Sequence, residues 1–155
     1  MLKVICNSTP IISLHSINRL DILNKTYGQI IIPNAVREEI NVKSKIIEKF
    51  DFFKICEIKN INVAKFFKTA LHKGEVEVIL LAQELEADLS IIDDLTARKF
   101  AEYMGLKITG TLGVLIKAKQ MKIIDKVKPI LNELIYNKIY ISDRVYNIII
   151  ELAGE

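Results

Sequence analysis

The stretch Leu89-Ser90-Ile91-Ile92-Asp93-Asp94 places two carboxylates directly after a short apolar run. A run of this length and composition is typical of a buried strand, and a helix-like pattern follows it. Two earlier segments have the same form, because Leu2–Cys6 ends at Asn7 and Gln29–Ile32 ends at Pro33. Short strands that alternate with helices predict an α/β fold, a three-layer sandwich with a mainly parallel, twisted sheet.

The remaining segments fit the same architecture, and no repeat, low-complexity tract or linker divides the chain. Residues 1–155 are therefore expected to form a single domain. The expected strands are Leu2–Cys6, Gln29–Ile32, Lys54–Ile58, Asp88–Ile92 and Lys107–Thr109. The expected helices are Pro10 to Gly28, Ala35–Ile40 with a continuation to Phe52, Val63–Leu71, Glu75–Glu86, Leu95–Met104, Thr111–Met121, Asp125–Tyr136 and Asp143–Leu152. The expected helix caps include Ser8 or Thr9, Thr111 and Ser142.

The net charge of the chain is +3, which permits nucleic-acid binding without requiring it. Cys6 and Cys56 lie in apolar runs and no Cys-x-x-Cys occurs, so free thiols in a reducing cytoplasm are expected. The first residues lack the apolar core of a signal peptide, and no stretch approaches the roughly 18–20 apolar residues that span a bilayer. These features predict a cytoplasmic protein without membrane contact.

Carboxylates recur at strand ends and helix starts, which favours one shared site. The carboxyl ends of parallel strands lie at one edge of a sheet, so acids that are distant in sequence can converge there. The candidate acids are Glu39, Glu75, Asp93 and Asp94. Crowded carboxylates repel one another unless a cation lies between them, and hard cations take oxygen ligands. The pattern therefore predicts a divalent-metal site of the kind that hydrolyses phosphodiesters.

Each candidate residue also has a purely structural alternative. Glu75 follows Gly74 at the start of an apolar helix, where a carboxylate favours the positive end of the helix dipole. Asp94 can cap the helix that follows it, and Asn7 can form an Asx turn. Glu39 can belong to the charged face of a surface helix.

Other site chemistries find no support in the sequence. His15 and His72 are isolated and lack the partner spacing of a zinc site. No G-x-G-x-x-G, Walker or G-x-S-x-G motif occurs. These absences argue against a dinucleotide enzyme, a P-loop NTPase and an α/β-hydrolase.

Five short segments follow one another along nearly the whole chain. They are Asn7-Ser8-Thr9-Pro10, Pro33-x-x-Val36-x-x-Glu39, Gly74-Glu75-x-Glu77-x-Ile79-x-Leu81-Ala82, Ile91-Ile92-Asp93-Asp94-x-x-x-Arg98 and Gly110-Thr111-Leu112-Gly113-Val114-Leu115. In this order and spacing they resemble the PIN-domain superfamily, and more closely its short stand-alone members related to VapC toxins. The resemblance implies a twisted parallel sheet between helices, an acid cluster that binds Mg²⁺ or Mn²⁺, and cleavage of single-stranded RNA by an activated water.

The resemblance also implies particular site residues. The family's four acid positions fall on Asn7, Glu39, Glu75, and either Asp93 or Asp94. Asn7 is a departure, because the commoner residue at that position is Asp. The implied catalytic residues are Glu39, Glu75, Asp93 and Asp94, and the implied metal ligands are these four together with Asn7. The expected contacts to substrate are Lys73, Arg98 and Thr111.

The sequence thus predicts a metal-dependent endoribonuclease, the toxin half of a toxin–antitoxin pair with a small antitoxin protein as partner. The alternative is a catalytically weak or inactive PIN-like module that binds nucleic acid or protein, and Asn7 supports it. A phospho-acceptor receiver fits less well, because its paired acids would follow the first strand. The apolar terminal helices, with residues 123–124 and 148–150, predict a homodimer unless they complete the core.

Overall fold

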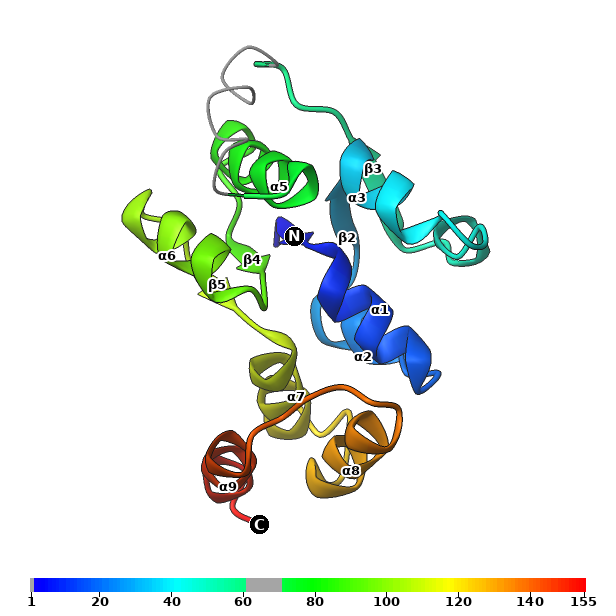
Figure 1. Cartoon of the computed structure of the whole chain (residues 1–155), viewed down its shortest axis with the longest axis vertical. Coiled ribbons are helices and arrows are strands. Elements are labelled where there is room, and N and C mark those ends of the chain that lie inside the picture. Colours follow the sequence, from blue (N-terminus) through cyan, green and yellow to red (C-terminus); the bar gives the residue numbers. More distant parts are fainter. Residues whose placement is uncertain (1, 61–70) are drawn as a thin grey trace.

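A computed structural model describes residues 2–60 and 71–155 of the chain. In this part the sheet has five strands, all parallel, in the order β3-β2-β1-β4-β5 (Figure 1). The strands are β1 (Val4–Cys6), β2 (Ile30–Pro33), β3 (Phe53–Cys56), β4 (Leu89–Ile91) and β5 (Ile108–Thr109). The predicted α/β class and parallel sheet are confirmed.

The helices follow the expected order, with several changes at their ends. They are α1 (Ser8–Ser16), α2 (Asp21–Tyr27), α3 (Asn34–Ile40), η1 (Ile47–Lys49), α5 (Lys73–Glu84), α6 (Leu95–Tyr103), α7 (Thr111–Gln120), α8 (Lys128–Tyr136) and α9 (Asp143–Leu152). The single helix expected up to Gly28 was wrong, because Asn18 has a φ of 56° and the chain breaks there into α1 and α2. The expected continuation to Phe52 is only the 3₁₀ turn η1. The expected helix Val63–Leu71 lies outside the described residues.

The helix caps also differ in part from the prediction. Asn7 caps α1 through its side chain, so neither Ser8 nor Thr9 is the cap. Thr111 is the first residue of α7, and the cap position belongs to Gly110. Ser142 caps α9 as predicted. The longest described helix, α5, has 12 residues, and none of the described helices could cross a lipid bilayer.

Helices cover both faces of the sheet and complete three layers. On one face α3 and α5 pack on the strands, with α6 beside α5 and β5 (Figure 1). On the other face α2 packs on β2 and α7 on β5, with α1 against α7. The last two helices lie outside this layer, α8 against α1 and α9 against α7.

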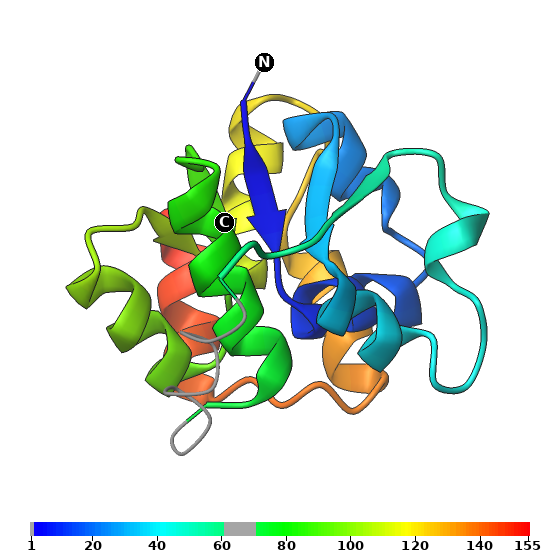
Figure 2. The same cartoon turned by 90° about the horizontal axis from the view of Figure 1, so that it is seen from above.

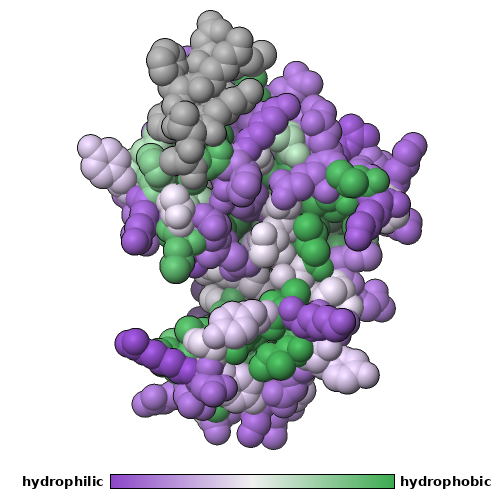
Figure 3. Space-filling view, viewed as in Figure 1, coloured by the Kyte–Doolittle hydropathy of each residue, from purple (hydrophilic) through white to green (hydrophobic). Residues whose placement is uncertain are grey.

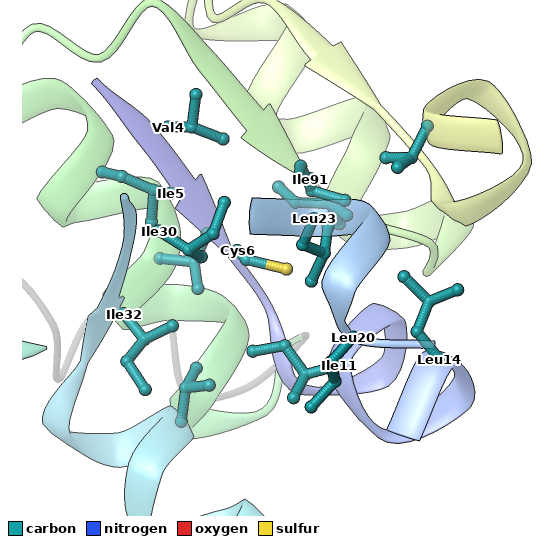
Figure 4. Close-up of a cluster of buried hydrophobic side chains, with 14 of the residues drawn as sticks. Val4, Ile5, Cys6, Ile11, Leu14, Leu20, Leu23, Ile30, Ile32 and Ile91 are labelled. Atoms are coloured by element: carbon teal, nitrogen blue, oxygen red, sulfur yellow. The ribbon is translucent and has the colours of Figure 1, made fainter. Parts of the chain in front are cut away.

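The core is centred on β1, whose residues Val4, Ile5 and Cys6 are fully buried. Figure 4 shows the Cys6 sulfur pointing toward the side chains of Ile11, Leu20 and Leu23, with Ile91 of β4 nearby. A strand buried on both faces reads as a continuous apolar run, which is the pattern expected for a parallel sheet. Each large aliphatic side chain buried here contributes roughly 1.5–3 kcal/mol to folding.

The strand order places a topological switch point between β1 and β4. The chain moves from β1 outward to β2 and β3, then returns to β4 on the other side of β1. Cys6 is paired with Ile91 at this point, and the backbone amide of Asn7 donates to the carbonyl of Ile91 at 2.9 Å. Ligands of open α/β sheets bind in the crevice at the carboxyl ends of such strands. The arrow of β1 points down the page in Figure 2, which is the direction toward the viewer in Figure 1. The carboxyl ends of the strands therefore lie on the side of the molecule that Figure 1 shows.

The side chain of Glu155 joins the last helices to α7. Its carboxylate accepts hydrogen bonds from the backbone amides of Val127 (2.7 Å) and Lys128 (3.0 Å) and from the ammonium of Lys119 (2.9 Å). Partial burial alone would raise the pKa of Glu155, but these hydrogen bonds outweigh it and lower the pKa to about 2. The carboxylate therefore acts as an ionised cap at the start of α8.

Replacing this cap by Glu155→Gln is expected to lower the free energy of unfolding at neutral pH by about 1 kcal/mol. Folding lowers the pKa of Glu155, so its contribution is present above its ordinary value of 4.5 and is lost as the pH falls toward 2. Urea unfolding at neutral pH and near pH 3 measures this, with the exposed Glu151→Gln of α9 as the control. An equal difference from wild type at both pH values would contradict the assignment.

Candidate functional site

The predicted site residues flank the switch point at the carboxyl edge of the sheet. Asn7 directly follows β1, and Asp93 and Asp94 follow β4 after one further residue. Glu75 lies in the first turn of α5, and Glu39 lies near the end of α3. Parallel strand pairing therefore accounts for the positions of Asn7 and the two aspartates, while helix packing accounts for the two glutamates.

The start of α5 closely approaches α3 at Gly74. A β-carbon built on Gly74 would lie 2.8 Å from Oε2 of Glu39 and 3.8 Å from Oδ1 of Asn7. The first distance is too short for an ordinary contact, so any larger residue would displace the Glu39 side chain. Glycine thus permits the carboxylate of Glu39 and the amide oxygen of Asn7 to flank the same point.

Glu75 is a buried carboxylate beside a second acid. Only 7% of the residue is exposed, and its Oε1 accepts a hydrogen bond from the amide of His72 at 2.9 Å. This contact belongs to a capping box at the start of α5, so the structural role proposed for Glu75 is present. Burial, and then the nearby carboxylate of Asp94, raises the pKa of Glu75 above its ordinary value. The carboxylates of Glu75 and Asp94 therefore repel each other when both are ionised, and a cation between them would relieve that repulsion.

Asp94 and Asn7 each cap a helix while lying at this edge. Oδ2 of Asp94 accepts from the amide of Ala97 at 2.9 Å, and Oδ1 of Asn7 accepts from the amide of Ser8 at 2.9 Å. Asp94 is exposed whereas Asn7 is only 3% exposed. Asp94 and Asn7 can therefore cap their helices and still serve the site, because capping holds their side-chain oxygens in fixed positions there.

Asp93 is bonded through both carboxylate oxygens to the start of α7. Oδ1 accepts from the amide of Thr111 at 2.7 Å and Oδ2 accepts from its hydroxyl at 2.6 Å. A β-carbon on Gly110 would lie 2.7 Å from both Oδ1 of Asp93 and Nη1 of Arg98, so glycine permits this close packing. Asp93 therefore ties the end of β4 to α7, and Thr111 is committed to that contact.

The predicted phosphate contacts lie in different surroundings. Lys73 is exposed and lines an open hollow of about 420 Å³ together with Glu39. Arg98 donates through Nη1 to the carbonyl of Ile92 at 3.2 Å, which fixes its guanidinium beside Asp93. We call the carboxyl edge of the sheet with Glu39, Glu75, Asp93 and Asp94 the acid edge. Of the three predicted contacts, Lys73 is therefore the one on its rim.

The site residues form two groups at this edge. Glu75 interacts with Asp94, and Glu39 and the neutral Asn7 both reach toward the Cα of Gly74. Among the described residues, no three His, Cys, Asp or Glu side chains form a group that could hold a metal ion. A metal held between the two groups would need oxygen from Asn7 as well as from the carboxylates, which suits a hard divalent ion.

Glu77 is a buried structural residue for which the sequence predicted no role of its own. It is only 8% exposed, and its Oε1 accepts from the amide of Ala35 at 3.2 Å. The contact joins α5 to the first turn of α3, the helix that carries Glu39. Its place two residues after Glu75 was visible in the sequence, but its burial depends on the packing of α3.

Cys6 does not provide a nucleophile for this site. Burial, and then the negative charge of Asp93, raises the pKa of the Cys6 thiol well above its ordinary value. The thiol therefore stays protonated, and its Sγ lies 3.3 Å from the carbonyl oxygen of Asn7 as a donor. Cys6 and Cys56 are both free, as predicted.

Removing the charge of the buried acid by Glu75→Gln is expected to stabilise the metal-free protein, raising its melting temperature by on the order of 2 °C. The amide oxygen can still accept from His72, while the repulsion from Asp94 is lost. Folding raises the pKa of Glu75, so its destabilising ionisation sets in as the pH rises above 4.5. Thermal melts in EDTA from pH 4 to neutral should show a growing difference from wild type, and the exposed Glu102→Gln should show none. A destabilised Glu75→Gln would mean that the cap outweighs the repulsion.

Comparison with known proteins identifies the family of the chain. A family model described as a PIN domain matches residues 3–155, nearly the whole chain, whereas a search of curated proteins found no match. The PIN domain is a nuclease-type fold whose members generally use divalent metal ions. The parallel sheet of the described residues, covered by helices on both faces, is consistent with that fold. The chain belongs to the PIN-domain family.

Proposed function

We propose that this protein is an endoribonuclease that cleaves single-stranded RNA with Mg²⁺ or Mn²⁺ bound at the acid edge. The observation that carries the proposal is the buried Glu75 at the switch point, close enough to Asp94 for that second carboxylate to help raise the pKa of Glu75. Burying one acid beside another is unfavourable for folding alone, and perturbed acids of this kind cluster at functional sites. The net charge of +3 is compatible with a polyanionic substrate.

The residues that would hold the metal are Glu75 and Asp94 from one side and Glu39 and Asn7 from the other. All four offer oxygen, the donor that Mg²⁺ and Mn²⁺ prefer. A bound divalent ion lowers the pKa of an attacking water and offsets the charge that grows on the phosphate. Asp93 acts as a positioning residue in this proposal, because both of its oxygens hold Thr111 at the start of α7.

The chain's own residues would orient the strand. Lys73 on the rim supplies a positive charge next to the acids, and such backbone contacts weaken as salt rises. Arg98, fixed on the Ile92 carbonyl, lowers the repulsion between Asp93 and an incoming phosphate. His72 donates its backbone amide to Glu75 and so keeps that carboxylate directed at the site.

We also propose a cytoplasmic, single-domain protein that acts as a homodimeric toxin and is bound by a small antitoxin protein. The apolar stripe of α9 supports the pairing of two copies, since Val145, Ile148 and Leu152 expose 38%, 44% and 66% of their surface. Ile124 and Ile149, by contrast, are buried and complete the core. A monomeric mass in light scattering at micromolar concentration would reject the dimer.

A second candidate function is a PIN-like module that binds nucleic acid or protein without cutting. Asn7 favours it, because a neutral oxygen stands where an acid is commoner and already accepts from the amide of Ser8. With one charge fewer, the site would bind a divalent ion more weakly. The two functions differ in whether RNA is cleaved, so a cleavage assay separates them.

Cleavage of labelled single-stranded RNA is expected to stop in EDTA and to return with Mg²⁺ or Mn²⁺. Glu39→Gln, Glu75→Gln and Asp94→Asn should each lower the rate by at least about 100-fold, because each removes a charged ligand from the metal. Glu102→Gln, an exposed acid of α6, serves as the matched control and should keep the wild-type rate. Activity that survives both EDTA and Glu75→Gln would reject the metal mechanism.

The substitution Asn7→Asp is expected to strengthen metal binding. The change is nearly isosteric, so the Ser8 cap can remain, but the added charge increases repulsion in the metal-free site. The thermal stabilisation by Mn²⁺ should therefore grow relative to wild type. Asn147→Asp on the exposed surface of α9 adds the same charge elsewhere and controls for net charge. A rise in cleavage supports the nuclease, tighter metal binding without cleavage supports the binding module, and an unchanged response to Mn²⁺ removes Asn7 from the ligand set.

A further inference from the structure

A second hollow lies beside the acid edge, between α1, α7, α8 and the α8–α9 loop (residues 137–142). Its volume is about 220 Å³. Its apolar lining comes from Leu112, Leu134, Ile139 and Ile141, and Tyr140 of the loop also lines it with 88% of its surface exposed. Figure 1 shows this loop crossing in front of α7, and Figure 3 shows apolar surface at the same place.

The polar lining of the hollow carries no positive charge. Thr9, Ser13 and Thr111 contribute to it, and Asp93 reaches it from the acid edge. None of the described residues that line the hollow is Lys or Arg. A phosphate therefore finds no cation among these lining residues, whereas a neutral ring with polar edges finds both apolar walls and hydroxyl groups.

We propose that this hollow receives one nucleobase of the RNA, stacked on the ring of Tyr140, next to the phosphate that is cut. The inference rests on the proposed function and adds a base subsite to it. Asp93 lines the hollow and is the chain neighbour of Asp94, one of the residues that would hold the metal in the proposed function, so a base in the hollow lies next to that site.

The size and position of the hollow favour a base over a larger occupant. Pockets for drug-sized ligands usually measure roughly 300–1,000 Å³, so about 220 Å³ suits a single planar ring system. An exposed aromatic ring is a stacking platform for single-stranded nucleic acid, since every base has a π-face. Tyr136 at the end of α8 is equally exposed, at 88%, but does not line the hollow.

This difference supplies a matched pair of variants. Binding is measured by fluorescence anisotropy with a labelled single-stranded RNA of about ten nucleotides, in a Glu75→Gln background so that the strand stays intact. Tyr140→Ala should weaken binding by about 5-fold or more, the usual effect of removing one base–aromatic stack. Tyr140→Phe keeps the ring and Tyr136→Ala keeps the hollow, so both should bind like the parent.

A second arm identifies the base. RNAs with one abasic position each are tested on the parent and on Tyr140→Ala. One position should weaken binding to the parent and have no further effect on Tyr140→Ala, because both changes remove the same stack. Equal affinity of Tyr140→Ala and Tyr136→Ala, or the absence of such a position, would overturn the subsite. A lower molar mass of Tyr140→Ala in light scattering would overturn it in favour of a contact between proteins.

The outcomes separate this inference from the proposed function. If wild-type protein binds RNA through Tyr140 without cleaving it, the nuclease proposal fails and the base subsite stands. If wild-type protein cleaves RNA with metal but Tyr140→Ala binds normally, the subsite fails and the nuclease stands. If the protein binds no single-stranded RNA, both are rejected.

Discussion

The burial of β1 between two parallel neighbours is the constraint on which the rest of the structure depends. Val4 and Ile5 are completely buried and paired with both β2 and β4, so the strand has no edge and no free face. At the carboxyl end of β1 the chain passes directly into α1, within the layers of helices that cover the sheet. The first polar residue there, Asn7, must satisfy its groups locally, and it does so with the carbonyl of Ile91 and the amide of Ser8.

The same edge concentrates negative charge where folding alone would avoid it. Glu75 is buried against Asp94, yet each also completes the start of a helix, α5 or α6. Helix N-termini carry partial positive charge, so these caps offset part of the cost of holding two acids together. The caps can therefore hold the two acids together without a metal, and in the proposed function a bound cation would relieve the repulsion that remains.

Two residues that do not belong to the proposed ligand set organise the site from outside. Glu77 joins α5 to the helix that carries Glu39, and Asp93 joins β4 to α7. Gly74 and Gly110 permit the close approaches that these contacts require, since a side chain at either position would collide with a charged group. The positions of the acids thus depend on packing between elements as much as on the acids themselves.

The sequence by itself determined the alternation of strands and helices, apart from the break between α1 and α2, together with the parallel sheet and the position of Asp93 and Asp94 after a strand. These follow from local patterns, because buried parallel strands are short apolar runs and their carboxyl ends share one edge. Only the tertiary structure decided which acids meet. The contact of Glu75 with Asp94, the commitment of Asp93 to Thr111 and the hollow beside Tyr140 join residues from different elements. Sequence periodicity places a side chain on a face of its own helix or strand, but the distance to another element depends on how the two pack.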